Sequence, residues 1–142
     1  MSAKRGGVVL NVDDTQERLR YRTHVLEESG YGVLEARTGR EALTLASDAQ
    51  PSLVLLDVLL PDVNGLEVCR LLKADPATHA IPVLHVSAAF HDEEHWVKGL
   101  QVGSDGYLRE PVGPDVLREV IRTLLRRVEA EALARRAFGR RS

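Results

Sequence analysis

The sequence lacks the residues that cross-link a chain or anchor it in a membrane. It contains one cysteine, Cys69, so no disulfide can form within the chain, and no cysteine and histidine stand at the spacing of a zinc site. No apolar run approaches the ~20 residues that a membrane-spanning helix needs. Only three apolar residues follow Lys4, Arg5 and the glycines after them, too few for a signal peptide. These absences predict a soluble, cytoplasmic protein with no membrane segment.

Neither sign of charge dominates the chain. Nineteen Lys and Arg stand against 21 Asp and Glu, which gives a formal net charge of -2. A dedicated nucleic-acid-binding domain is usually strongly basic, so we expect no direct contact with nucleic acid. The 142 residues are enough for one compact domain with a hydrophobic core of its own.

What the sequence does contain is an alternation of short apolar runs with longer amphipathic segments. The short runs are typical of strands that are buried on both faces. They cover residues 8–12, 31–36, 53–57, 82–87 and 107–108, and in the third of them four apolar residues lead directly into an acid. The segments between them have apolar residues at helical spacing. They predict helices over residues 15–29, 39–49, 66–73, 93–101 and from Pro114 onward. This alternation predicts an α/β fold: a flavodoxin-like, doubly wound, five-stranded parallel sheet in the order 2-1-3-4-5, with helices on both faces.

Three aspartates follow two of the predicted strands. Asp13 and Asp14 come directly after the first strand, and Asp57 closes the third. These strands are neighbours in the expected order, so their carboxylates should converge at one edge of the sheet. A single acid at a strand end is usually a solvated cap, but three converging acids repel one another unless a cation is present. The pattern therefore predicts a metal or phosphoryl site, and hard oxygen ligands suit Mg²⁺.

Ser87 ends the fourth predicted strand, beside the third. Its hydroxyl could donate a hydrogen bond to a phosphoryl oxygen at the same edge. Taken alone, a serine at a strand end is more often a turn or cap residue.

Taken together, these residues resemble the response-regulator receiver domains of two-component signalling. The resemblance covers residues 8–125, nearly the whole predicted fold. Each motif is weak alone, but their order and spacing are jointly specific. The motifs are Val12-Asp13-Asp14, Leu55-Leu56-Asp57, Pro61-Asp62-Val63-Asn64-Gly65, Val86-Ser87-Ala88, and Gly106-Tyr107-Leu108 before Pro111.

The resemblance implies a phosphorelay function. Asp57 would accept a phosphoryl group from a histidine kinase or a phosphotransfer protein. Asp14, Asp57 and the backbone carbonyl of Leu59 would bind Mg²⁺ directly, and Asp13 would act largely through water. The metal would neutralise charge on the transferring group.

The resemblance also implies a conformational switch. Ser87 would move toward the phosphoryl oxygen, and Tyr107 would rotate inward behind it. The face formed by the fourth helix, the fifth strand and the fifth helix would then change, and a homodimer could form through it. A partly buried aromatic residue with no switching role would give the same sequence pattern.

One position departs from the family pattern. The family has a lysine immediately before the proline, where this chain has Glu110 before Pro111. Two unit charges ~4 Å apart interact by roughly 4 kcal/mol at an effective dielectric constant of 20, so the reversal matters. Arg109 cannot replace the lysine, because neighbouring strand residues point to opposite faces. The resemblance also makes the Glu110-Pro111 bond a candidate for the cis form.

Glu110 leaves three outcomes open. The glutamate could turn out into solvent and leave phosphorylation weaker but intact, which is the outcome we expect. It could join the metal site as a further acidic ligand. Or the chain could be a phosphorylation-independent pseudo-receiver, an interaction module that keeps the fold alone.

An enzyme is the remaining alternative. Phosphohydrolases that resemble the haloacid dehalogenase class use an aspartate nucleophile on a similar sheet, with a second acid two residues later as general acid. Here that position is Leu59, which argues against this class. We therefore expect no enzyme but a phosphoacceptor that assists its own phosphorylation, either a stand-alone receiver or one cut from a larger hybrid histidine kinase or regulator.

The C-terminal residues predict a helix that runs beyond the domain. Residues 116–138 combine apolar residues with many arginines and glutamates, and the apolar spacing partly follows a coiled-coil seam. We divide the chain into a receiver domain over residues 1–125 and a helical extension or linker over residues 126–142. The long final helix favours a link to a missing domain over the end of a stand-alone receiver. A frayed, arginine-rich tail is the alternative.

The charge reversal gives a first prediction. The Glu110→Lys variant should take up phosphate from a small phosphodonor at least as well as the native chain, because a repulsive charge is removed. A phosphate-retention gel measures the yield, and a lower yield would count against repulsion by Glu110.

Overall fold

The computed structural model of the protein describes residues 7–88 and 93–139. Within these residues, five strands alternate with five helices. They are β1 (Val8–Val12), α1 (Gln16–Glu28), β2 (Gly32–Ala36), α2 (Gly39–Ala49), β3 (Leu53–Leu56), α3 (Gly65–Ala74), β4 (Val83–Ser87), α4 (Glu93–Gln101), β5 (Gly106–Arg109) and α5 (Pro114–Gly139). Every strand and helix expected from the sequence is present, and the ends differ by at most two residues where both ends were predicted.

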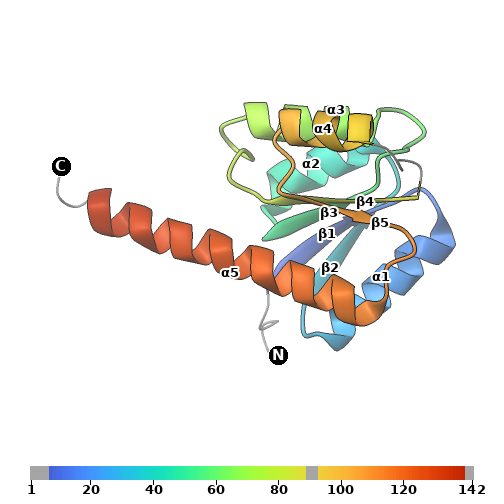
Figure 1. The fold of residues 1–142 in the computed structure, drawn as a ribbon, viewed down its shortest axis with the longest axis horizontal. Helices are drawn as coiled ribbons and strands as arrows, with labels where there is room; N and C mark the ends of the chain where they lie inside the picture. The colour runs from blue at the N-terminus through green and yellow to red at the C-terminus, as the bar shows by residue number, and fades with distance from the viewer. Residues whose placement is uncertain (1–6, 89–92, 140–142) are drawn as a thin grey trace.

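The strands form one parallel sheet in the order β2-β1-β3-β4-β5, which confirms the predicted flavodoxin-like topology. Helices α1 and α5 cover one face of this sheet, and α2, α3 and α4 cover the other (Figure 1). Side chains of a strand alternate between the two faces. On β3, Leu53 and Leu55 therefore pack in one apolar cluster, and Val54 and Leu56 pack in the other. Burial on both faces explains why this strand is entirely apolar.

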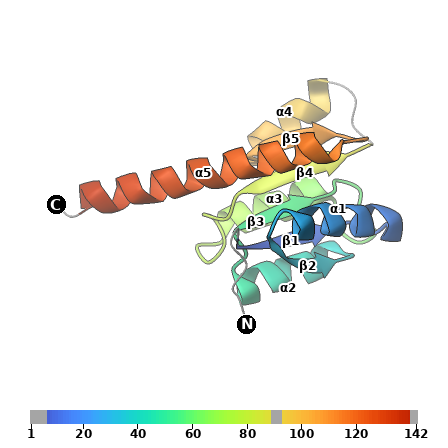
Figure 2. The ribbon, with the colours of Figure 1, turned by 90° about the horizontal axis from the view of Figure 1, so that it is seen from below.

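Helix α5 is much longer than the other helices. Leu117, Ile121 and Leu124 bury its first half against the sheet. The helix then continues past the body of the domain (Figure 2), where Leu133 and Phe138 are exposed. Its course is continuous through the predicted boundary at residue 125, and the division of the chain there stays a prediction. In the described part of the chain, no helix has the length and apolarity needed to span a membrane.

Gly65 seats the start of α3 against the chain that follows β3. Its N–H donates a 2.7 Å hydrogen bond to the carbonyl of Val58. A Cβ atom at this position would lie 2.0 Å from the backbone oxygen of Asp57 and 2.8 Å from Cα of Val58. Only a glycine allows the helix to approach this closely, so Gly65 helps to fix the backbone that presents Asp57.

His85 is a fully buried polar residue in the middle of β4. Its Nε2 lies 3.2 Å from the carbonyl of Gly65, and its Nδ1 lies 2.8 Å from the hydroxyl of Ser104. A carbonyl oxygen can only accept a hydrogen bond, so Nε2 carries the proton and Nδ1 of the neutral ring can accept one. Burial lowers the pKa of His85 to about 4, which keeps the ring neutral.

Gly65→Ala should destabilise the protein, because the added methyl group meets backbone atoms that cannot rotate away. We expect a loss of about 1–3 kcal/mol in the free energy of unfolding, measured in urea. Gly99→Ala on α4 is the matched control, since a Cβ there has no close neighbour outside its own helix. That control should gain about 1 kcal/mol from helix propensity. Equal effects of the two substitutions would show that the close approach at Gly65 is unimportant.

The neutral, buried His85 should make stability depend on pH. Below pH 6.5, the ordinary value, the unfolded chain binds a proton, while the folded chain does so only near pH 4. The free energy of unfolding should therefore decrease as the pH falls through this range, by about 3 kcal/mol in total. The His85→Gln variant lacks this titration and isolates its contribution from that of the acids. NMR titration of the ring gives the pKa directly, and a midpoint near 6.5 would refute this account.

Candidate functional site

Three aspartates meet at the carboxyl ends of β1 and β3, as the sequence predicted. Val12 pairs with Leu56 in the sheet, so the residues that follow them, Asp13 and Asp57, lie side by side. One carboxylate oxygen from each of Asp13, Asp14 and Asp57 lies within 4.8 Å of the others. Asp13 and Asp57 are buried, and Asp14 is exposed. The parallel pairing of two central strands thus creates a compact acidic cluster.

Asp57 has a buried carboxylate oxygen that lacks a hydrogen bond from the described residues. Its Oδ1 accepts a 2.9 Å hydrogen bond from the N–H of Val58. Its Oδ2 is buried and accepts no hydrogen bond from the described residues; Nη2 of Arg18 lies 3.7 Å away. Burial, and next the charge of Asp13, raise the pKa of Asp57 to about 6, although Arg22 and Arg18 act in the opposite direction. An unsatisfied buried carboxylate oxygen is a position at which a ligand would be stabilising.

The cluster fits a hard divalent cation such as Mg²⁺, because it consists of carboxylates and includes the unsatisfied Oδ2 of Asp57. Both oxygens of Asp13 already accept hydrogen bonds. Oδ1 accepts one from the N–H of Thr15, and Oδ2 accepts one each from Arg18 and Arg22. The carboxylate of the exposed Asp14 and Oδ2 of Asp57 are therefore better placed than Asp13 to bind a cation directly.

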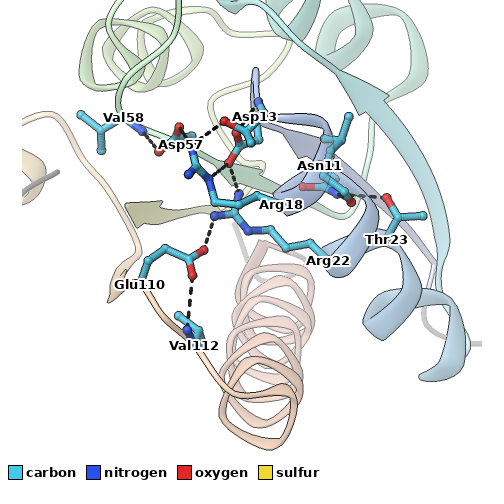
Figure 3. A network of polar contacts seen from close by, with 11 residues as sticks. Asn11, Asp13, Arg18, Arg22, Thr23, Asp57, Val58, Glu110 and Val112 are labelled. Carbon is cyan, nitrogen blue, oxygen red and sulfur yellow. Dashed lines mark hydrogen bonds and ion pairs between the residues drawn. The ribbon is translucent and has the colours of Figure 1, made fainter. Parts of the chain in front are cut away.

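Two arginines of α1 complete the site, and sequence reasoning missed both (Figure 3). Arg22 is 1% exposed, and its Nη1 donates to Oδ2 of Asp13 at 2.8 Å. Its Nη2 donates to Oε1 of Glu110. The side chain of Arg18 is 40% exposed, and its Nε donates to the same Oδ2 of Asp13 at 3.0 Å. The acidic cluster is thus bordered by positive charge from one helix.

Our expectation that Glu110 turns out into solvent is wrong. Its side chain is 14% exposed and is paired with Arg22, and its Oε2 lies 3.3 Å from the N–H of Val112. Nor does Glu110 join the cluster of three aspartates. The physical reason is the buried guanidinium of Arg22, which needs acidic partners and pairs with Asp13 through Nη1 and with Glu110 through Nη2. Arg109 is exposed, as strand alternation predicted, and the Glu110-Pro111 bond is cis.

This pairing removes the basis of the prediction made for Glu110→Lys. A lysine at this position would face Arg22 instead of relieving repulsion at Asp57, and Arg22 would lose one of its two counter-charges. We now expect that variant to be destabilised.

A signal for Arg22 was present in the sequence. The residue follows Leu19 by three positions and precedes Leu26 by four, so helical spacing places it on the buried stripe of α1. A charge on such a stripe needs a partner. That partner, Glu110, lies 88 residues away, and helical spacing could not identify it.

The remaining predicted residues lie at or near the same edge of the sheet. Ser87 is buried at the end of β4, and its carbonyl accepts a 3.1 Å hydrogen bond from the N–H of Glu110. Tyr107 pairs with His85 in the sheet and is partly buried. Leu59 is exposed, two residues after Asp57. The metal, switching and phosphoryl-binding roles expected of these residues stay predictions.

Comparison with known proteins identifies what the fold and the site belong to. The family model of the response regulator receiver domain matches residues 9–122. The chain is 38% identical over 125 residues to the alkaline phosphatase synthesis transcriptional regulatory protein PhoP of Bacillus subtilis, which covers 87% of this chain and 50% of that protein. It is 36% identical over 118 residues to the polar-differentiation response regulator DivK of Brucella ovis, which covers 82% of this chain and 94% of that protein.

A solved structure agrees with these relatives. The signal receiver domain of a signal transduction histidine kinase from Syntrophus aciditrophicus superposes with a TM-score of 0.78 at 34% identity, over 84% of this chain and 89% of that one. The chain spans about half the length of PhoP and nearly all of DivK. The match over most of the chain, the shared topology and the three aspartates lead to one conclusion. The chain belongs to the response regulator receiver domain family.

Proposed function

We propose that the chain is the phosphoacceptor module of a two-component phosphorelay, and that Asp57 receives the phosphoryl group. The observation that carries this proposal is the buried Oδ2 of Asp57, which accepts no hydrogen bond from the described residues and lies within the acidic cluster. The phosphodonor would be a phosphohistidine on a histidine kinase or a phosphotransfer protein.

The transfer follows from the chemistry of the two groups. A carboxylate oxygen of Asp57 attacks the phosphorus, a new O–P bond forms, and the N–P bond of the phosphohistidine breaks. The imidazole nitrogen keeps the electron pair of that bond, and the ring takes up one proton from solvent on its other nitrogen, so the donor leaves as a neutral histidine and Asp57 becomes an acyl phosphate. With a pKa of about 6, the Asp57 carboxyl is mainly ionised at neutral pH, which is the form that can attack.

The residues that would bind Mg²⁺ are those expected from the sequence. Asp14, Asp57 and the carbonyl of Leu59 would bind it directly, and Asp13, whose oxygens are already engaged by Thr15, Arg18 and Arg22, would act through water. When bound, the ion supplies positive charge to the transferring phosphoryl group.

The proposal includes an output face. Ser87 would bind a phosphoryl oxygen and Tyr107 would rotate behind it, which would change the surface of α4, β5 and α5. Apolar side chains on that surface support a contact with an output partner or a second copy. They are Val97 and Leu100 on α4 and Val116 on α5, all exposed. The origin of the chain in a hybrid histidine kinase or a regulator stays a prediction. So does its cytoplasmic location. We also still predict that this part of the protein has no enzymatic activity and does not bind nucleic acid.

A phosphorylation-independent interaction module is the second candidate. The observation that favours it is Glu110, which stands where the family has a lysine and is engaged with Arg22. In this case the acidic cluster would be a remnant without phosphoryl chemistry.

Labelling with acetyl phosphate distinguishes the two candidates. In the presence of Mg²⁺, intact-mass spectrometry should detect one phosphoryl adduct on the native chain and none on Asp57→Asn, because the nucleophilic oxygen is lost. Asp48→Asn, which changes an exposed acid on α2, is the matched control and should label like the native chain. EDTA should abolish labelling. A native chain that stays unlabelled with Mg²⁺ would favour the interaction module, and an adduct on Asp57→Asn would place the acceptor elsewhere.

A further inference from the structure

We propose that α1 supplies the positive charge that a lysine after β5 supplies elsewhere in the family. Arg18 would contact the phosphoryl group carried by Asp57, and Arg22, paired with Glu110, would be a positioning residue that fixes Asp13. This inference rests on the proposed function of Asp57.

Arg18 is the cation with access to the phosphoryl position. Its Nη2 donates a 2.8 Å hydrogen bond to Oγ1 of Thr15 and lies 3.7 Å from Oδ2 of Asp57, which is beyond hydrogen-bond distance for the carboxylate itself. A phosphoryl group on that oxygen adds three further oxygens around it. The guanidinium is partly exposed, so it can adjust its position, and its planar donors match the geometry of a phosphoryl group.

Arg22 has a different role because it is buried and both of its terminal nitrogens donate to acids, whereas Nη2 of Arg18 donates to a hydroxyl. Nη1 donates to Asp13 and Nη2 donates to Glu110, and the side chain is buried. It cannot turn toward a phosphoryl group without leaving an acid unpaired in the interior, which is strongly unfavourable. Its contribution is therefore to hold Asp13 and to place a fixed positive charge beside the cluster.

The charges balance in the same way as in the family pattern. Three aspartates and one lysine carry a formal charge of -2. Here the three aspartates and Glu110 carry -4, and Arg18 and Arg22 carry +2, so the site again carries -2. Glu110 is then the counter-ion of a relocated cation. It does not leave the site with excess negative charge relative to the family.

A second contact fixes α1 against the chain that follows β5. The hydroxyl of Tyr21 donates a 2.9 Å hydrogen bond to the carbonyl of Val112, two residues after Glu110. Two contacts from the same helix therefore determine where Arg18 and Arg22 stand relative to the end of β5.

Beryllofluoride with Mg²⁺ tests the role of Arg18, because it mimics a phosphoryl group on aspartate without a covalent reaction. Arg18→Gln should weaken its binding at least about tenfold, since a charge-assisted hydrogen bond is lost, and Arg18→Lys should recover part of the affinity. Arg20→Gln removes the same charge from an exposed position on α1 and should bind like the native chain. Fluorine NMR measures the affinities.

The outcomes separate this inference from the function on which it rests. If Arg18→Gln binds beryllofluoride as well as Arg20→Gln does, the role of Arg18 is overturned while the function of Asp57 stands. If the native chain neither binds beryllofluoride nor accepts phosphate, the proposed function fails and this inference fails with it.

A charge reversal at Glu110, alone and combined with removal of the charge of Arg22, tests the Arg22–Glu110 pair. Glu110→Lys should lower the melting temperature, because two cations then face each other in a buried position, and Arg22→Met combined with Glu110→Lys should recover most of the loss. An unchanged melting temperature for Glu110→Lys would show that Glu110 is no counter-ion.

The same double variant gives a readout that stability alone would not change. It places a lysine where the family has one, so adding Arg18→Gln to it should weaken beryllofluoride binding less than Arg18→Gln weakens it in the native chain. An equal loss in both backgrounds would refute the relocation of the cation from β5 to α1.

Discussion

The parallel pairing of β1 with β3 is the constraint on which the rest of the site depends. It places Asp13 beside Asp57 at the ends of two strands that are buried on both faces. Two carboxylates that are close together and shielded from water cannot both be charged without positive charge nearby. Burial and the nearby charge of Asp13 accordingly raise the pKa of Asp57 to about 6. The arginines of α1 supply positive charge beside these acids, and Glu110 pairs with Arg22, the one that is buried.

The ion pair with Arg22 explains why a glutamate can stand at position 110. A glutamate beside three aspartates is unfavourable if only the strands are considered. It is favourable once Arg22 lies between it and Asp13, because the buried guanidinium then pairs with an acid through each of its terminal nitrogens. The positive charge has moved from the end of one strand to the neighbouring helix, and the acid has taken its former place. A departure from a family motif can therefore preserve the electrostatics of a site.

The backbone around the acids is held by uncharged groups. Gly65 permits α3 to begin in contact with the backbone of Asp57, and His85 connects the carbonyl of that glycine to Ser104 before β5. Burial keeps the imidazole of His85 neutral, so it adds no charge to a site that is already crowded with them. These contacts link the segment between Asp57 and Gly65 to β5, which carries Tyr107, the residue expected to switch.

The sequence by itself determined the topology, the limits of the strands and helices, and the convergence of Asp13, Asp14 and Asp57. These features depend on the spacing of apolar residues along the chain. They also depend on the general rule that the carboxyl ends of parallel strands lie at one edge of the sheet. Only the tertiary structure decided what Glu110 does and that Arg18 and Arg22 border the site. The reason is that a buried charge takes its partner from whatever the fold brings near it, and here that partner lies 88 residues away. Helical spacing places Arg22 on a buried stripe, but only the packed fold shows which acids receive it.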